Sequence, residues 1–114
     1  MINYTLLSFD KITSTSDLLK EHFSSFSHFT VIKTNYQTQG RGQYERTWSS
    51  NPNENILFSI LLKDLNVNQM DYLKQWIANS IIEFLRSFDL HPQFKQPNDI
   101  YVDNKKICGI LFES

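Results

Sequence analysis

The sequence is poor in residues that crosslink a chain or interrupt its helices and strands, with one cysteine, three glycines and three prolines. The single cysteine, Cys108, cannot form a disulfide within the chain, which excludes a disulfide-held scaffold. Cys108 lies in an apolar stretch with no histidine beside it, a setting that favours a packed, unreactive thiol over a nucleophile. The three histidines, His22, His28 and His91, match no metal-ligand spacing, so the sequence predicts no metal site.

The sequence also lacks an excess of one charge and any long apolar run. Eleven basic and twelve acidic residues leave a formal net charge of -1, which argues against a dedicated binder of nucleic acid or membrane surfaces. No apolar run approaches the roughly 20 residues that cross a bilayer. Residues 1–4 lack the basic start of a signal peptide. We therefore expect a cytoplasmic protein with no nucleic-acid and no membrane partner.

Apolar and aromatic side chains are abundant. The chain is 40% hydrophobic and contains nine Phe, five Tyr and two Trp residues, which predicts a folded core rather than disorder. Its 114 residues fit one domain at most. A chain of this length buries roughly two-thirds of the surface that its unfolded state exposes.

The pattern of apolar residues predicts an α+β fold. The continuous apolar run 56–62 is typical of a strand covered on both faces. A long apolar stripe that includes Trp76, Phe84 and Phe88 predicts a helix that packs on the sheet and places these side chains in the core. Several strands follow one another without an intervening helix, which predicts a mixed or antiparallel sheet with helices on one face. The predicted elements are strand 4–9, helix 15–22, strands 29–35 and 56–62, helix 68–88, and short strands 93–95, 100–102 and 106–112.

Two of the three glycines flank Arg41 in the stretch 37–48. Gly40 and Gly42 permit backbone conformations closed to other residues and let backbone N–H groups approach a ligand closely. Such a loop can wrap an anion, with Arg41 and Arg46 supplying positive charge. Taken alone, so short a motif favours a tight surface connection with solvated arginines.

A second polar stretch favours the anion site. It reads Lys-Gln-Pro-Asn-Asp-Ile over residues 95–100 and is followed by Lys-Lys-Ile-Cys-Gly-Ile-Leu over 105–111. Both stretches concentrate cations in an otherwise balanced chain, which predicts a small local anion site rather than an extended polyanion track.

Four motifs in order resemble the catalytic domain of biotin–protein ligases, in the biotin/lipoate ligase superfamily. The family motif Ser-Thr-Asn reads Ser14-Thr15-Ser16, and Gly-Arg-Gly-Arg-x-x-Arg-x-Trp reads Gly-Arg-Gly-Gln-Tyr-Glu-Arg-Thr-Trp over 40–48. Lys-Trp-Pro-Asn-Asp reads Lys-Gln-Pro-Asn-Asp over 95–99. Lys-[Leu/Ile]-x-Gly-Ile-Leu-x-Glu is matched over 106–113. The resemblance implies a partial class II synthetase-like fold that corresponds to the first half of the family's catalytic domain.

The resemblance implies a ligase that makes biotinyl-5′-AMP from biotin and ATP and transfers biotin to a lysine of a carboxylase's biotin carrier domain. Mg²⁺ is expected with the ATP phosphates. Arg41 and Lys95 are the implied catalytic residues. The implied biotin-binding residues are Ser14, Thr15, Gln37, Gly40, Arg41 and Lys95, and the implied nucleotide- or phosphate-binding residues are Gly40, Arg41, Gly42, Arg46, Asn98 and Lys106.

Each implied role has a structural alternative. Ser14 and Thr15 are also ordinary helix caps. Lys95 is also a common type of solvated edge-strand residue. Gln43 and Gln96 depart from the family's arginine and tryptophan, which favours an inactive biotin- or carrier-binding remnant as the first alternative. A lipoate-type acyltransferase is the second alternative, although its usual Arg-Arg-x-x-Gly-Gly-Gly loop is absent from the sequence.

The resemblance reaches residue 114 without the family's later strands. We expect neither an N-terminal DNA-binding domain nor a C-terminal small domain. An apolar strand at 106–112 would then leave a bare sheet edge, and a homodimer that covers this edge is the predicted assembly.

Overall fold

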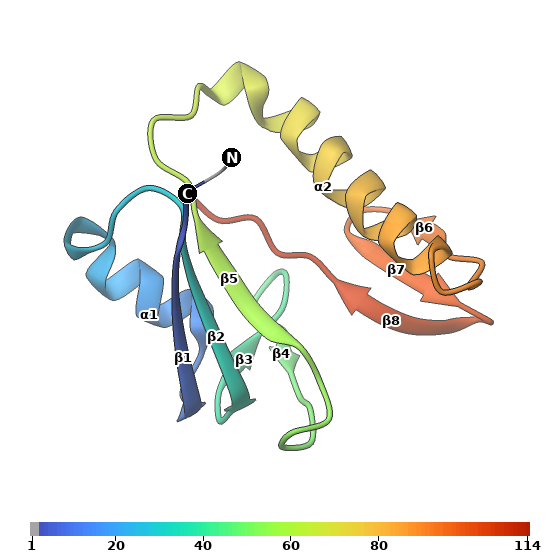
Figure 1. Cartoon of the computed structure of the whole chain (residues 1–114), viewed down its shortest axis with the longest axis horizontal. Coiled ribbons are helices and arrows are strands. Elements are labelled where there is room, and N and C mark those ends of the chain that lie inside the picture. Colours follow the sequence, from blue (N-terminus) through green and yellow to red (C-terminus); the bar gives the residue numbers. More distant parts are fainter. Residues whose placement is uncertain (1–2) are drawn as a thin grey trace. The chain divides into compact units, whose positions relative to one another are not determined.

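The computed structural model describes residues 3–114, and their contacts group into two compact units, Met1–Asp64 and Leu65–Ser114. Each unit combines a helix with a sheet (Figure 1). The α+β class that the sequence predicts is therefore confirmed. None of the described helices has the length and apolar character needed to span a membrane.

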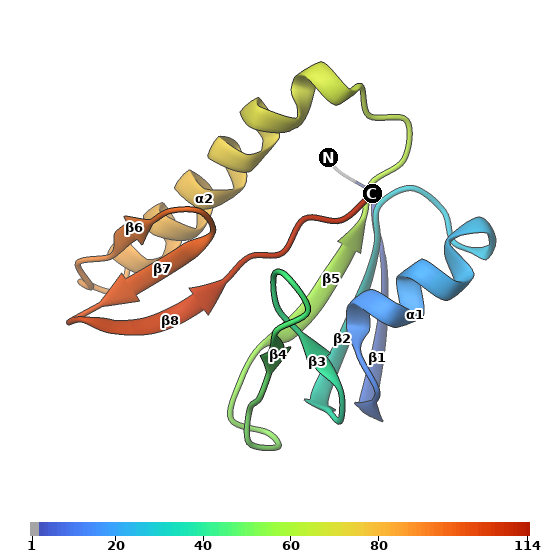
Figure 2. The same ribbon diagram turned by 180° about the vertical axis from the view of Figure 1, so that it is seen from behind.

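The first unit is a three-stranded mixed sheet with one helix on it. The order is β1-β2-β5, with β1 parallel to β2 and β2 antiparallel to β5. The helix α1 connects the two parallel strands and lies against one face of the sheet (Figures 1 and 2). The bounds are β1 Thr5–Ile12, α1 Thr15–His22, a 3-10 turn Phe23–Ser25, β2 Thr30–Gln37 and β5 Leu57–Leu61.

The bounds of α1 match the predicted helix because its start is encoded locally. Ser14 has extended backbone angles, and its hydroxyl accepts a hydrogen bond from the Asp17 backbone N–H at 3.2 Å. This bond satisfies one of the donors that a helix leaves open at its first turn. Leu19 then buries its side chain together with Ile32 and Leu57 from the sheet, which forms the core of the unit.

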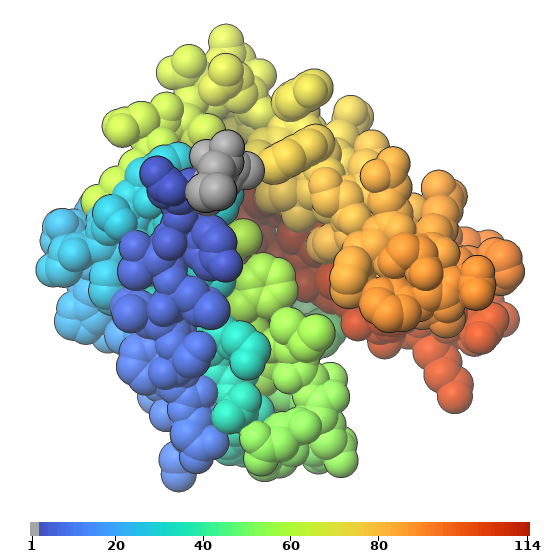
Figure 3. Space-filling model, in the orientation of Figure 1, coloured from blue at the N-terminus to red at the C-terminus, as the bar shows by residue number. Residues whose placement is uncertain are grey.

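Burial alternates along β5, so the prediction that this strand is covered on both faces is wrong. Leu57 is buried, whereas Phe58 and Ile60 are 52% and 44% exposed. Successive side chains of a strand point to opposite faces, and α1 covers only the face that carries Leu57. Side chains of β1 and β5 lie at the surface in Figure 3. An apolar run can thus belong to a half-exposed strand.

A short hairpin follows β2. Its strands are β3 (Gly40–Arg41) and β4 (Thr47–Trp48), paired antiparallel with Gly40 opposite Trp48. The turn between them has positive φ angles at Tyr44 (55°) and Glu45 (63°). Within residues 3–114 no glycine has a positive φ, so Gly40 and Gly42 do not use the left-handed backbone freedom that glycine permits.

The second unit contains α2 and an antiparallel sheet in the order β6-β7-β8. Asp103 and Asn104 form the β7–β8 turn with φ values of 52° and 64°. Asparagine and aspartate tolerate this left-handed region best among non-glycine residues, and the predicted hairpin is confirmed. The bounds are a 3-10 turn Val67–Gln69, α2 Met70–Arg86, β6 Gln93–Lys95, β7 Asp99–Val102 and β8 Lys105–Gly109.

The apolar stripe of α2 is wider than its buried side. Trp76, Phe84 and Phe88 are 56%, 58% and 62% exposed, so the prediction that they belong to the core is wrong. The buried residue of this helix is Ala78. Apolar spacing at three and four residues identifies the helix, but the surface that covers it decides which members of the stripe are buried.

Candidate ligand-binding site

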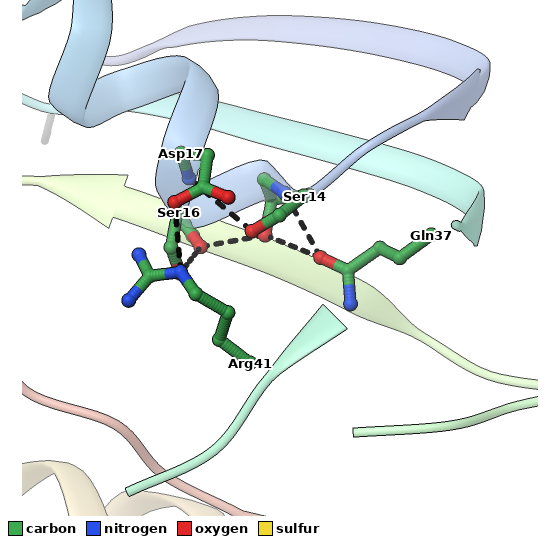
Figure 4. A network of polar contacts seen from close by, with 7 residues as sticks. Ser14, Ser16, Asp17, Gln37 and Arg41 are labelled. Carbon is green, nitrogen blue, oxygen red and sulfur yellow. Dashed lines mark hydrogen bonds and ion pairs between the residues drawn. The ribbon is translucent and has the colours of Figure 1, made fainter. Parts of the chain in front are cut away.

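Polar side chains gather on the covered face of the first unit, where α1 begins (Figure 4). Ser14 and Thr15 are 1% and 3% exposed. Gln37, at the end of β2, accepts hydrogen bonds through its side-chain oxygen from the Thr15 backbone N–H at 2.9 Å and from the Thr15 hydroxyl at 3.1 Å. Three of the predicted site residues therefore lie together, at the meeting point of a strand end and a helix start.

The contact with Thr15 fixes the orientation of the Gln37 amide. A backbone N–H can only donate, so the atom that faces it must be the amide oxygen. The amide nitrogen of Gln37 is then directed toward Gly40, where the Cβ atom of any larger residue would lie 2.8 Å from it and 2.4 Å from the Trp48 carbonyl oxygen. Glycine is required at position 40 because the Trp48 backbone and the Gln37 side chain lie so close to it, and not because of its φ angle.

The remainder of the glycine motif forms the hairpin turn. The Gly42 backbone N–H donates to the Arg46 carbonyl at 2.7 Å, and the Arg46 N–H donates to the Gln43 carbonyl at 3.2 Å. A Cβ atom at Gly42 would meet the Arg46 Cβ at 3.4 Å, an ordinary contact distance. Arg46 is exposed, and its described hydrogen bonds are made by its backbone.

Arg41 forms an ion pair with Asp17 from the first turn of α1. Its Nε atom lies 2.7 Å from the Asp17 Oδ1 atom, and both side chains are 30% exposed. The sequence motifs indicated Arg41 as a site residue but did not identify its partner Asp17. An acidic residue three positions after a helix cap is a common sequence feature, and nothing in the spacing links it to an arginine 24 positions later.

Ser59 of β5 is the second residue that the sequence did not identify. Its hydroxyl lies 2.6 Å from the Thr15 hydroxyl and 3.2 Å from the Ser16 hydroxyl. One signal was available, because Ser59 is the only polar residue in the apolar run 56–62. Ser59 pairs with Ile32 in the antiparallel register, so it lies on the face that α1 covers.

The remaining predicted residues lie in the second unit. The Lys95 ammonium lies 4.2 Å from the centre of the Tyr101 ring, an arrangement that favours a cation–π interaction. Lys106 pairs with Asp99 at 2.9 Å between its Nζ and the Oδ1 atom. Asn98 accepts a hydrogen bond from the Ile110 N–H at 2.9 Å through its backbone carbonyl. Lys95 and Lys106 thus lie on the sheet β6-β7-β8, and Asn98 lies in the turn between β6 and β7.

Cys108 lies on the same sheet, opposite Ile100. Burial raises the pKa of its thiol, and the nearby Asp99 carboxylate raises it further against a smaller opposing effect of Lys106. A raised pKa keeps the thiol protonated near neutral pH, and the thiol is a much poorer nucleophile than the thiolate. This environment agrees with the inert cysteine that the sequence predicts.

The described acidic residues do not form a metal site by themselves. Among residues 3–114 no group of three or more histidine, cysteine, aspartate or glutamate side chains is placed to hold a metal ion. Asp17 and Asp99 each face a cationic side chain within 3 Å.

Comparison with known families and proteins gives consistent matches. The family model described as "Biotin/lipoate A/B protein ligase family" matches residues 6–114. The Bifunctional ligase/repressor BirA of Bacillus spizizenii is 30% identical over 86 residues, which are 74% of this chain and 26% of that protein. Biotin--protein ligase 1, chloroplastic, of Arabidopsis thaliana is 25% identical over 111 residues, covering 91% of this chain and 30% of that protein.

Solved structures share the fold. The biotin protein ligase from Aquifex aeolicus in complex with biotin and ATP has a TM-score of 0.81 and 31% sequence identity, covering 96% of this chain and 47% of that one. The biotin protein ligase from Leishmania major in complex with biotin has a TM-score of 0.75 and 26% identity, covering 98% of this chain and 51% of that one. The chain thus spans about half of these structures and less than a third of the curated relatives named above.

Proposed function

Because the chain belongs to the biotin/lipoate A/B protein ligase family, we propose that it binds biotin and ATP, forms biotinyl-5′-AMP and passes biotin to a carrier lysine. The observation that carries this proposal is the partly buried network of Thr15 and Gln37 beside Arg41. It combines hydroxyl and amide groups with a guanidinium at the end of one sheet. This combination suits a ligand with a polar ring at one end and a carboxylate at the other.

The polar network matches the head group of biotin. The ureido ring presents two N–H donors and one carbonyl acceptor. Thr15 supplies a hydroxyl oxygen, and the Gln37 amide nitrogen supplies two N–H donors, since its oxygen is engaged by Thr15. Ser14 caps α1 through its hydroxyl, so a contact with biotin would be a second role for this residue.

The cationic residues suit the first chemical step. A carboxylate oxygen of biotin attacks the α-phosphorus of ATP, the bond to the bridging oxygen breaks, and pyrophosphate leaves. Two anions must approach each other, so the site has to stabilise negative charge. We assign this task to Arg41 and Lys95, with Gly40 and Gly42 closing over the acyl phosphate, and phosphate contacts to Arg46, Asn98 and Lys106.

Mg²⁺, when bound with ATP, would neutralise charge on the outer phosphates. In the second step the neutral amine of a carrier lysine attacks the acyl carbonyl and AMP leaves. No nucleophilic side chain of the chain itself is required. The proposed partner is the biotin carrier domain of a carboxylase, the proposed location is the cytoplasm, and the proposed assembly is a homodimer.

The direct test is biotin-dependent exchange of labelled pyrophosphate into ATP, catalysed by the full chain. We expect exchange that Arg41→Ala reduces at least tenfold, with Arg86→Ala as a control that removes an arginine from the last turn of α2. Exchange that Arg41→Ala leaves unchanged would contradict the proposal. Lipoate in place of biotin tests the acyltransferase alternative, since the family includes both ligase types.

An inactive binding module is the second candidate function. The pairing of Arg41 with Asp17 favours it, because a neutralised arginine stabilises an incoming phosphate less well. Biotin binding without pyrophosphate exchange would support this candidate over the ligase.

The proposed homodimer is tested by light scattering at a protein concentration of roughly tens of micromolar. Finding only monomer at this concentration would contradict the homodimer.

A further inference from the structure

Ser59 is placed where it can control the hydrogen-bonding character of Thr15. The two hydroxyl oxygens lie 2.6 Å apart, a typical distance for a hydrogen bond between hydroxyl groups. Ser59 comes from β5 and Thr15 from the first turn of α1, so the contact joins the sheet to the helix start. The Ser16 hydroxyl approaches Ser59 at 3.2 Å from the same turn.

The direction of every hydrogen bond in this cluster follows from Gln37. Its amide oxygen has only lone pairs and faces the Thr15 hydroxyl at 3.1 Å, so Thr15 must donate its single proton to Gln37. Thr15 has no second proton, and Ser59 must therefore donate to Thr15. The oxygen of Ser59 is then left to accept from Ser16. All hydrogen bonds of the cluster therefore point in one direction: Ser16 donates to Ser59, Ser59 to Thr15, and Thr15 to Gln37.

We infer that Ser59 is a positioning residue of the ligand site: by donating to Thr15, whose own proton goes to Gln37, it leaves a single oriented lone pair on Thr15 that selects ligands presenting an N–H group. One lone pair of Thr15 accepts from Ser59, and its proton is committed to Gln37. What remains for a ligand is one acceptor lone pair. This inference rests on the proposed biotin site, in which the ureido ring would supply the N–H group.

The polarity also makes the site selective. A ligand with a carbonyl or ether oxygen at this point would face another lone pair and leave a buried acceptor unsatisfied. A site that needs a donor rejects ligands without one more strongly than a site that discriminates by shape alone. The reason is that such a ligand leaves the buried acceptor without a hydrogen bond. Ser59 contributes without touching the ligand, since its hydroxyl occupies one lone pair of Thr15 and so orients the lone pair that faces the ligand.

The test compares three variants of the full chain. Ser59→Ala removes the hydroxyl, and Ser59→Thr keeps a hydroxyl on a side chain that strands tolerate well. Thr30→Val is the matched control, because it removes a buried hydroxyl of β2 that donates to the Ser27 carbonyl at 2.8 Å, outside the cluster. Biotin affinity is measured by calorimetric titration.

We expect Ser59→Ala to weaken biotin binding about fivefold, the effect of one neutral hydrogen bond. Ser59→Thr and Thr30→Val should both stay within about twofold of wild type, even though Thr30→Val lowers thermal stability. Unchanged binding in Ser59→Ala, or an equal loss in Thr30→Val, would overturn the inference. A biotin analogue methylated on both ureido nitrogens should bind wild type at least tenfold more weakly, and equal binding would refute the selection of an N–H group by the lone pair of Thr15.

Failure of the proposed function is recognised separately. A wild-type chain that binds no biotin overturns the function, and the role of Ser59 is then decided by hydrogen exchange of the Thr15 backbone amide in the ligand-free chain. We expect Ser59→Ala to speed this exchange about fivefold relative to Thr30→Val at matched global stability. Equal exchange in the two variants would show that Ser59 does not position Thr15.

Discussion

The Nε atom of Arg41 lies 2.7 Å from the Asp17 carboxylate, so the cation to which we assign the anionic ligand is already paired with an anion. Asp17 lies in the first turn of α1, where a negative charge also interacts favourably with the helix dipole. An incoming carboxylate or phosphate must therefore share Arg41 with Asp17. We expect this competition to limit how strongly the proposed site attracts anions.

The first prediction concerns Asp17→Asn, which keeps the side-chain size and removes the charge. We expect pyrophosphate and biotin to bind about threefold to tenfold more tightly, because Arg41 no longer interacts with a competing carboxylate. The expected loss of unfolding free energy is below about 1 kcal/mol, since the pair is partly exposed. Titration calorimetry at low and at high salt measures the effect. Weaker binding would instead mean that Asp17 orients Arg41 for its ligand.

The second prediction separates the two glycines of the motif. Gly40→Ala should lower the free energy of unfolding by about 1–3 kcal/mol, because the new Cβ would lie 2.4 Å from the Trp48 carbonyl oxygen. Gly42→Ala should change it by less than about 0.5 kcal/mol, since the nearest contact is 3.4 Å and the φ angle is not positive. Urea denaturation measures both. Equal destabilisation would contradict the close approach at Gly40.

The sequence predicted those features that neighbouring residues determine. Ser14 specifies the start of α1, and Asp103 and Asn104 specify the β7–β8 turn, so both elements were found with correct positions. The contact between Thr15 and Ser59 joins residues 44 positions apart, and no local pattern encodes it. The gathering of Ser14, Thr15 and Gln37 followed from the family resemblance rather than from their spacing.

Exposure was predicted poorly for the same reason. The apolar residues of β5 and α2 were assigned to elements of the correct type, but Phe58 and Trp76 are more than half exposed. Hydrophobic periodicity reports which face of an element is apolar. Burial depends in addition on which other surfaces of the chain lie against that face, and this information is not local.

The third prediction concerns Cys108. Because burial raises the pKa of its thiol, alkylation by iodoacetamide at about pH 8 should be at least tenfold slower than for a free thiol and should accelerate on unfolding in urea. The pKa in the folded state lies above that in the unfolded state. The resulting contribution to stability is therefore complete below the unfolded pKa and is lost as pH rises through the folded pKa.

Measured unfolding free energies of the wild type should accordingly fall more steeply above about pH 8.5, the ordinary thiol range, than those of Cys108→Ala. Parallel pH profiles for the two proteins would argue that the thiol titrates normally in the folded state. The alanine variant serves as the control, because it keeps a small apolar side chain at this position of β8.

The last prediction separates the structural and the ligand-binding roles of Gln37. A glutamate at this position keeps an oxygen that accepts from the Thr15 N–H and hydroxyl, and its charge lies near the start of α1, where the helix dipole favours an anion. The free energy of unfolding of Gln37→Glu should therefore lie within about 1 kcal/mol of wild type, whereas that of Gln37→Leu should fall by about 1–3 kcal/mol, because the buried Thr15 backbone N–H loses its acceptor. Both variants lack the amide nitrogen that would donate to the biotin carbonyl, so both should bind biotin at least tenfold more weakly. Calorimetric titration and urea denaturation of the two proteins measure these effects side by side. Full biotin binding by Gln37→Glu would mean that the amide nitrogen has no part in recognition, and equal stability of the two variants would mean that the Thr15 contacts contribute nothing to the fold.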